Sequence, residues 1–400
     1  MTRLLMIAAL AIAIPRTVGA VPCDQVPGLS NIVYLQVGDT QLNLMKRLAR
    51  AMRDNADRPV SMVFLTSGSC ANIATLYNST PIAANTNMQY VPSMAENAAW
   101  TPAMPTLTCQ VPAGTVPDIA NSALFNSACT PDAAPATVKL TQGPAQAYVL
   151  AVPEASSQTA ITFEEAYFVF GFGALGMIAP WTVETQMFIR TVTKSTLLAW
   201  AANISVPADK WKGVRRDGSP MVVADLTGTT SVNEAIGILG AEVYDGLRDQ
   251  LNVLAFRAKG QYAAYFPDST STARDKKNVR DGHYTVWSPT IWMDRIDGNQ
   301  TPLKPDARYL VDLIAGKTVT PAPGFDMIGM IAAVGLVPDC AMGVKRSFEG
   351  GPLSLYRPAQ SCVCKYESLV GATPSCAPCS AAQPSCAMGT CRNDFCEVDE

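Results

Sequence analysis

Asn31-Ile-Val-Tyr-Leu-Gln-Val37 opens the stretch that decides the fold. It is short, apolar and rich in β-branched residues, which predicts a strand. A small polar turn, Gly38-Asp39-Thr40, follows directly. From Gln41 to Arg53, apolar and basic side chains recur at helical spacing, which predicts an amphipathic helix.

The same unit then occurs a second time. Val60–Leu65 predicts another strand, Thr66-Ser67-Gly68-Ser69 another small turn, and Cys70–Tyr77 the start of another helix. A βαβα beginning is typical of a largely parallel sheet with helices packed on its faces. The sequence therefore predicts a fold of the α/β class.

Both turns fall where a strand ends and a helix begins. In parallel sheets, ligands bind beyond the carboxyl ends of the strands. Turns of Gly, Ser and Thr let backbone N–H groups and hydroxyls reach a ligand at the positive end of a helix, which suits an anion. The alternative is that Thr40 and Ser69 are ordinary helix N-caps, and for either turn alone this alternative is the stronger one.

A chain of 400 residues predicts two or three domains. Arg3, the apolar run Leu4–Ile14 and the small residues Val18-Gly19-Ala20 predict a secretory leader over residues 1–20, too short to span a bilayer. The glycine-containing run Ala166–Pro180 is also too short to span one and predicts buried core. We expect a soluble protein that is periplasmic or secreted, in the cell envelope.

The charge pattern argues against nucleic acid as a partner. Without the leader the chain carries 28 basic and 33 acidic residues, and no basic run stands out. A negative protein can still bind an anion, because helix ends and one or two basic side chains set the local field.

Twelve cysteines in an exported chain predict disulfides. Four are spread over the first third of the chain, where Cys109 and Cys129 are candidates to close a loop with each other. Eight occur from Cys340 onward, in a segment poor in large apolar residues, which predicts an appendage held together by disulfides. The pairing within the appendage stays open.

Metal binding is the alternative for the cysteines of the appendage. Cys362-x-Cys364 and Cys376-x-x-Cys379 have tolerable spacing for ligands. No histidine accompanies them, and an oxidising compartment favours disulfides. We therefore expect neither a metal nor a cofactor.

A third strand–turn–helix junction lies in the middle of the chain. Thr185–Thr191 predicts a strand, Val192–Ser195 a polar turn, and Thr196–Trp200 a helix. This junction carries two cations, Arg190 and Lys194. Further along, the apolar and β-branched run 221–226 predicts another strand.

Three of these stretches resemble the phosphate-binding proteins of bacterial ABC transporters, which have the type II periplasmic-binding-protein fold. Thr66-Ser-Gly-Ser-Cys-Ala-Asn-Ile73 resembles the second ligand loop of that family, a Ser/Gly run that opens a helix. Arg190-Thr-Val-Thr-Lys-Ser-Thr196 lies where the family has an Arg, three residues and then Ser-Gly-Thr. Asp118-Ile-Ala-Asn-Ser122 resembles the third loop. The resemblance extends over about residues 30 to 335 and is diffuse.

The resemblance implies a two-lobed α/β fold with the ligand held between the lobes. Between the leader (1–20) and the Cys-rich appendage (339–400), both predicted from composition, it divides the chain into lobe 1 (22–147 and 258–338) and lobe 2 (148–257). It implies an oxyanion such as phosphate as ligand, and a membrane transporter or an envelope protein as partner. The residues that it assigns to the ligand site are Gly38, Asp39, Thr40, Ser67, Gly68, Ser69, Ser122, Arg190, Lys194, Ser195 and Thr196.

Two departures from the family pattern concern the ligand. The family has an Asp at the end of the third loop, which accepts the proton of monohydrogen phosphate, and this chain has Ala123 there. Lys194-Ser195 replaces the small pair Ser-Gly. A site without the acceptor loses a physical reason to prefer a protonated oxyanion over sulfate or a carboxylate.

Two other classes of function are weighed against solute binding. A serine hydrolase needs a base beside its nucleophile, His283 is the only histidine, and no Gly-x-Ser-x-Gly elbow is present, so we expect no enzyme and no catalytic residue. A structural or interaction protein whose cleft has degenerated is the stronger alternative, and Ala123 and Lys194 favour it somewhat.

Overall fold

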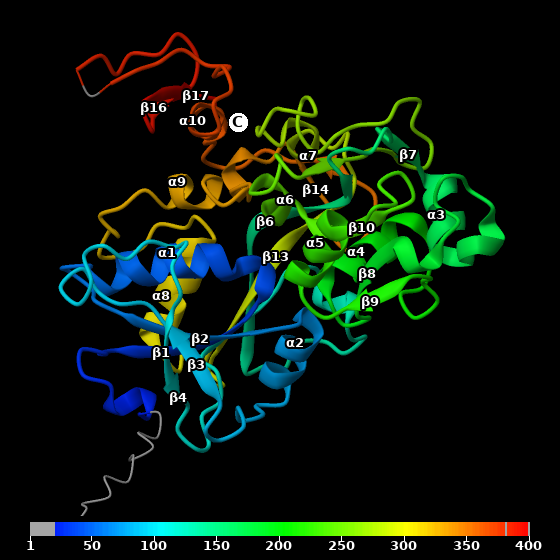
Figure 1. The fold of residues 1–400 in the computed structure, drawn as a ribbon. Helices are drawn as coiled ribbons and strands as arrows, with labels where there is room; N and C mark the ends of the chain where they lie inside the picture. The colour runs from blue at the N-terminus through cyan, green and yellow to red at the C-terminus, as the bar shows by residue number, and fades with distance from the viewer. Residues whose placement is uncertain (1–20, 381, 399–400) are drawn as a thin grey trace, which may run out of the picture.

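The computed structural model describes residues 21–380 and 382–398, so the predicted leader lies outside the described residues. Two lobes lie side by side, lobe 1 around β1, β2 and α1 and lobe 2 around β8, β10 and α4 (Figure 1). The chain beyond Cys340, which we call the appendage, ends above the region where the lobes meet (Figure 1). The fold is therefore two-lobed with an added C-terminal part.

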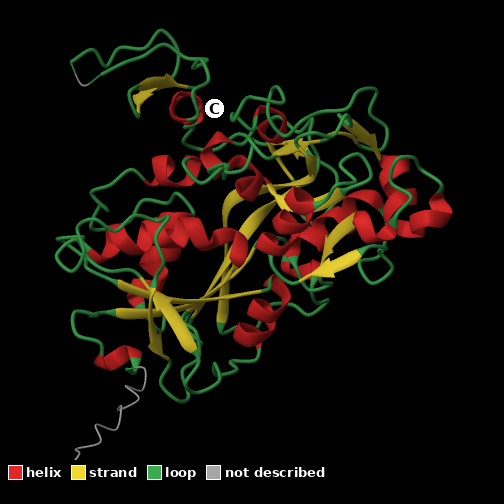
Figure 2. Cartoon of the chain, in the orientation of Figure 1, coloured by secondary structure: helices red, strands yellow, loops and turns green. Residues whose placement is uncertain are grey.

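The elements alternate between strands and helices along most of the chain (Figure 2). The strands are β1 (Ile32–Gly38), β2 (Ser61–Ser67), β3 (Asn87–Tyr90), β4 (Leu107–Gln110), β5 (Ile119–Ser122), β6 (Val138–Pro153), β7 (Ala160–Thr162), β8 (Met187–Arg190), β9 (Val214–Arg216), β10 (Ile236–Gly240), β11 (Leu251–Val253), β12 (Ala255–Arg257), β13 (Trp287–Arg295), β14 (Val344–Lys345), β15 (Ser354–Leu355), β16 (Thr390–Arg392) and β17 (Phe395–Glu397). The α-helices are α1 (Leu42–Arg53), α2 (Ser69–Tyr77), α3 (Phe163–Phe172), α4 (Ser195–Ile204), α5 (Ser219–Gly228), α6 (Ala241–Asp245), α7 (Lys277–Arg280), α8 (Pro305–Ile314), α9 (Met327–Ala332) and α10 (Val363–Leu369). The 3-10 helices are η1 (Cys23–Gln25), η2 (Asp39–Gln41), η3 (Asn126–Ala128), η4 (Gly173–Gly176), η5 (Glu184–Gln186) and η6 (Asp339–Ala341). Within the described ranges, none of these helices has both the length and the apolar character that crossing a membrane requires.

One sheet runs through both lobes in the order β4-β3-β2-β1-β5-β13-β6-β10-β8-β9, with β11 also paired to β6. The prediction of a largely parallel sheet is wrong. Parallel pairs lie within each lobe, β1 with β2 and β5, and β8 with β9 and β10. β13 runs antiparallel to β5 and β6, and β6 runs antiparallel to β10, so the sheet is mixed where the lobes meet.

The long strand β6 connects the two lobes. It pairs with β13 from Val138 to Ala147 and with β10 from Tyr148 to Ala151. One strand thus belongs to the sheet of lobe 1 at its beginning and to that of lobe 2 at its end. The predicted boundaries of the lobes stay a prediction.

Helix α1 forms as its periodicity predicts. Leu44, Met45, Leu48 and Met52 are buried on one face, and they pack against β1, β2, α8 and α9. The basic residues occupy the other face, and two of them, Arg50 and Arg53, end the helix, where positive charge suits the macrodipole. Anchoring α1 in this way fixes the turn that precedes it.

The predicted strand over residues 221–226 is wrong, because these residues lie within helix α5. Pro220 occupies the first turn, where its missing N–H costs nothing. Val222 and Leu226, four residues apart, are fully buried and face Gly237 of β10. Packing of this face against the sheet outweighs the β-propensity of the valines.

All twelve cysteines form disulfides, which confirms the disulfide prediction. The prediction that Cys109 and Cys129 close a loop is wrong, because their partners lie on neighbouring elements brought close by the sheet and by α2. The six pairs are Cys23–Cys109, Cys70–Cys129, Cys340–Cys362, Cys364–Cys376, Cys379–Cys391 and Cys386–Cys396. Since every sulfur is oxidised, the close group Cys379, Cys386 and Cys396 offers no thiolate to a metal.

Candidate functional site

Three loops of lobe 1 meet where β1, β2 and β5 end. The N–H of Gly38 donates to Asn121 Oδ1 at 2.9 Å, and the N–H of Ala123 donates to Ser69 Oγ at 3.1 Å. Asn72 Nδ2 of α2 donates to the Asn121 carbonyl at 2.8 Å. These bonds hold the first, second and third predicted ligand loops together.

Arg190 brings a buried cation to these loops from the end of β8. Its side chain is fully buried, and Nη2 lies 2.8 Å from Asp39 Oδ2 of lobe 1. The same guanidinium donates to Ser219 Oγ at 2.5 Å and to the Asp217 carbonyl at 2.9 Å. The structure thus joins two predicted site residues of different lobes, Asp39 and Arg190.

The N-termini of α2 and α4 approach each other across the lobes. A Cβ added to Gly68, which precedes α2, would lie 3.3 Å from the Thr193 carbonyl and 3.4 Å from the Lys194 side chain. A larger residue at position 68 would therefore push the lobes apart. Ser195 and Thr196, in the first turn of α4, are buried. We call the region formed by residues 38–41, 67–69, 121–123, Arg190 and 194–196 the interlobe site.

Buried donors in the interlobe site have no partner within the described residues. They are Thr40 Oγ1 and Asn121 Nδ2 in lobe 1 and Arg190 Nε in lobe 2. A buried donor without a partner costs free energy, and native proteins seldom retain one without a reason. Each of the three is therefore a free donor for an acceptor bound in the interlobe site.

Some predicted residues have partners within their own lobe. The Ser122 hydroxyl donates to the Leu124 carbonyl at 2.7 Å, and Lys194 Nζ lies 3.6 Å from Asp217 Oδ1. Ser67 lies at the end of β2 beside Gly38 and is partly exposed. The structure therefore brings the predicted loops together but gives Ser122 and Lys194 partners of their own.

A chain of polar side chains extends the interlobe site toward α6. Gln41 Nε2 donates to Gln146 Oε1 at 2.6 Å, and Gln146 Nε2 donates to Glu242 Oε2 at 3.2 Å. Burial, together with the nearby Asp39 and Asp245, raises the pKa of Glu242 to about 8, although Arg190 acts to lower it. At neutral pH this carboxyl is therefore largely protonated.

The appendage adds a second buried acid, Glu349. Both of its carboxylate oxygens are buried without a hydrogen-bond partner in residues 21–380 and 382–398. Burial raises its pKa to about 7, while the nearby charge of Arg346 lowers it. The pKa of buried Tyr148 is raised by burial and then by Glu349, and its hydroxyl donates to the Ala123 carbonyl. Glu349 therefore lies close to the third loop.

Sequence reasoning missed Asn121, Gln146, Tyr148, Glu242 and Glu349. Asn121 belongs to the third-loop motif Asp118–Ser122, and its position directly before Ser122 could have marked it as a site residue. The other four are recruited by tertiary structure, and no local pattern marks them. His283, weighed as a base, is half exposed, lies 2.9 Å from Asp281 and stacks on Tyr265, away from the interlobe site.

No protein-family model and no curated protein matches the sequence. Among solved structures, the chain is similar to a phosphate-bound structure from Clostridium perfringens, assigned to the phosphate ABC transporter substrate-binding proteins. The two share 13% identity with a TM-score of 0.51, over 77% of this chain and 99% of the other. A phosphate transport receptor from Vibrio cholerae shares 12% identity with a TM-score of 0.48, over 77% and 99% of the two chains. The predicted fold is confirmed: the chain has the two-lobed fold of the type II periplasmic binding proteins.

Proposed function

We propose that the protein captures a small, phosphate-like oxyanion in the interlobe site. One observation carries this proposal. Unpartnered buried donors come from both lobes: Thr40 precedes α1, Asn121 lies at the end of β5, and Arg190 ends β8, while α2 and α4 begin in the same interlobe site. Helix N-termini and oriented N–H groups stabilise an anion without needing excess positive charge.

The acidic groups nearby are compatible with this role. Asp39 is paired with Arg190, and burial raises the pKa of Glu242 and Glu349 to about 8 and about 7. Their protonated forms are populated at neutral pH, which weakens the repulsion of an anion. A protonated carboxyl is also a hydrogen-bond donor.

The disulfides support a place of action outside the cytoplasm, because such bonds persist in oxidising compartments. We propose a periplasmic or secreted protein that delivers its ligand to a membrane transporter. The fold similarity to substrate-binding proteins supports this proposal, and the appendage is the part of the chain that suits a further envelope partner.

Calorimetric titration of ligand-stripped protein with phosphate, and then with sulfate, tests the proposal. Thr40→Val removes an unpartnered hydroxyl and keeps the side-chain volume, so we expect about tenfold weaker anion binding with an unchanged melting temperature. Thr227→Val is the matched control, because that hydroxyl bonds only to carbonyls of its own helix α5. Absence of heat with both anions in the folded wild-type protein would contradict the proposal.

The second candidate is an interaction protein that uses the same fold without a ligand. It is favoured by the three acidic side chains Asp39, Glu242 and Glu349, which all raise the pKa of Tyr148. Within the interlobe site, the fully buried guanidinium of Arg190 offsets the negative charge of these groups. The titration with phosphate and sulfate separates the two candidates.

A further inference from the structure

A cavity of about 550 Å³ lies between the lobes, beside the interlobe site. Helix α1 of lobe 1, helix α6 of lobe 2, residues 332–335 and the end of α10 in the appendage form its walls. Thr40, Asn121 and Arg190 do not line it. The volume is in the range of cavities that hold small organic ligands.

Two arginines with free donors line this cavity. Arg47 of α1 makes no hydrogen bond or ion pair within the described part of the chain, and its Nε is buried. Arg274 donates from Nη1 to the Asp245 carbonyl at 2.8 Å and forms no ion pair within that part. Each guanidinium therefore keeps donors for an acid group in the cavity.

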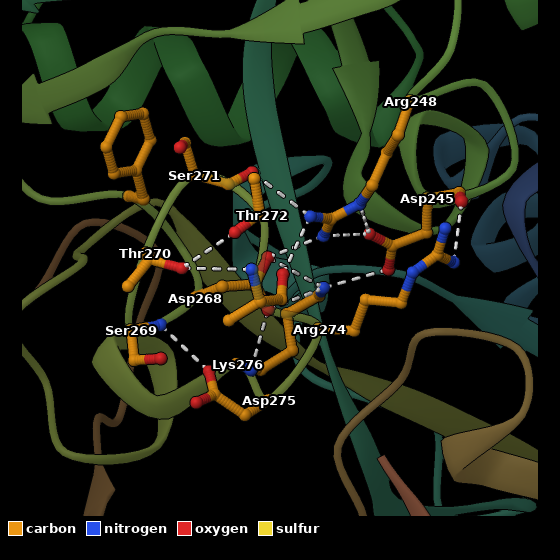
Figure 3. A network of polar contacts seen from close by, with 12 residues as sticks. Asp245, Arg248, Asp268, Ser269, Thr270, Ser271, Thr272, Arg274, Asp275 and Lys276 are labelled. Atoms are coloured by element: carbon orange, nitrogen blue, oxygen red, sulfur yellow. Dashed lines mark hydrogen bonds and ion pairs between the residues drawn. The ribbon is translucent and has the colours of Figure 1, made fainter. Parts of the chain in front are cut away.

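A buried ionic network holds the loop that carries Arg274 (Figure 3). Lys276 Nζ lies 2.8 Å from Asp245 and 3.0 Å from Asp268, and Arg248 pairs with the same two acids at 2.5 Å and 2.7 Å. Two cations thus balance two carboxylates, so Asp245 adds little negative field to the cavity. The network fixes the loop 268–276 against α6 and with it the position of Arg274 (Figure 3).

Glu242 adds a polar group that is more than nine-tenths buried and lines the cavity. Its Oε1 has no partner within residues 21–380 and 382–398, while Oε2 accepts from Gln146. Burial raises the pKa of this carboxyl, so its neutral form can donate to an acid group. The remaining wall includes apolar side chains, Val334 and, from the appendage, Leu369 and Val370.

We propose that this cavity is a second binding site, for an organic anion. Its acid group would meet Arg47 of α1 and Arg274, which is held against α6 of lobe 2, with Glu242 beside it. Its apolar body would lie on Val334 and Leu369. The appendage then has a defined role, since it completes the apolar wall. The proposal is independent of what the interlobe site binds.

The test uses the full chain and a probe that combines an acid group with an apolar body, 8-anilino-1-naphthalenesulfonate. We expect a saturable fluorescence increase at one site per chain. The double variant Arg47→Gln with Arg274→Gln is expected to weaken it at least about tenfold, because two charge-assisted contacts are lost. Ala333→Trp, on an exposed position of the wall, is expected to abolish it by filling the cavity.

Three controls make the outcome specific. Arg257→Gln removes a surface arginine that pairs with Glu164 and is expected to leave the dye affinity unchanged. Thr40→Val is also expected to leave it unchanged, since Thr40 lies in the interlobe site. Dye affinity equal to that of the wild type in the folded double variant and in Ala333→Trp would overturn the proposal. Melting curves establish that each variant is folded, because unfolded chains also bind the dye.

Discussion

The Asp39 carboxylate lies 2.8 Å from the Arg190 guanidinium, and this ion pair joins the end of β1 in lobe 1 to the end of β8 in lobe 2. Asp39 is partly exposed, whereas Arg190 is fully buried. The pair therefore has two effects. It holds the lobes together, and it neutralises the cation that an anion in the interlobe site would meet.

Asp39→Asn separates these effects. Loss of the negative charge leaves Arg190 buried without its counter-charge, so we expect the free energy of unfolding to fall by about 1 to 3 kcal/mol. An anion would then meet an uncompensated guanidinium, so we expect phosphate affinity to rise severalfold. Urea unfolding and calorimetry measure the two quantities. Asp225→Asn, which breaks the Arg216–Asp225 pair within lobe 2, is the control. Weaker binding in Asp39→Asn would show that Asp39 contacts the ligand.

Glu242→Gln tests the buried acid. An acid whose pKa is raised on folding holds its proton more tightly in the folded state, so stability is fully present below the unfolded pKa near 4.5 and decreases as pH rises toward about 8. Glutamine resembles the protonated form at every pH. We expect the advantage of the variant to be smaller than about 1 kcal/mol at pH 5 and to grow above pH 8 by more than about 1.4 kcal/mol, the free energy of one pKa unit.

Thermal unfolding of both proteins from pH 5 to pH 9 measures this difference. Glu164→Gln on the surface is the matched control and is expected to show no such trend. A stability difference that does not change with pH would mean that Glu242 is ionised in the folded protein.

The sequence predicted the parts of the fold that depend on local pattern. The two early strand–turn–helix units formed as expected because the apolar faces of β1, β2 and α1 determine them. The run 221–226 was mispredicted because contact with Gly237 decides its conformation. The sheet was mispredicted as parallel because β13 pairs antiparallel with β6, the strand that connects the lobes. This pairing joins residues that are far apart in the sequence, so no local pattern predicts it.

The same distinction between local pattern and long-range contact applies to the candidate site. The turns around Thr40 and Ser69 were found from small residues at helix starts, a local signal. Glu349, which is 226 positions after Ala123, carries no such signal, because only the folding of the appendage brings it near the third loop. The pairing of cysteines was likewise unpredictable, since spacing alone does not select partners.

Removal of the Cys340–Cys362 disulfide is expected to destabilise the whole protein. This bond closes a loop of 22 residues and lies beside the core of lobe 2, into which Tyr366 packs. Substituting both cysteines by alanine is expected to lower the free energy of unfolding by about 3 kcal/mol. The same change at Cys379–Cys391, outside that core, is expected to leave the main transition unchanged. Equal effects of the two changes, measured by urea unfolding, would contradict this account.

Lys276→Met tests the ionic network of Figure 3. Lys276 is fully buried, and its loss leaves Asp245 and Asp268 with one cation, Arg248, in place of two. Removing one partner of a buried pair costs about 3 to 5 kcal/mol, and we expect a loss of this size in urea unfolding. Lys277→Met, next to it and exposed, is the control and is expected to change stability by less than about 0.5 kcal/mol. A similar loss in both variants would show that the network does not fix the loop.

The most direct measurement of the central claim is phosphate binding by Asn121→Asp, compared with the wild type by equilibrium dialysis. Asp keeps the oxygen that accepts from the Gly38 N–H and replaces the unpartnered Nδ2 donor by a negative oxygen. The account predicts one phosphate per wild-type chain and at least a hundredfold weaker binding in the variant, since a donor is lost and a repulsive charge is gained, together about 3 kcal/mol or more. Equal phosphate binding by the two folded proteins would contradict the claim that the interlobe site holds the anion.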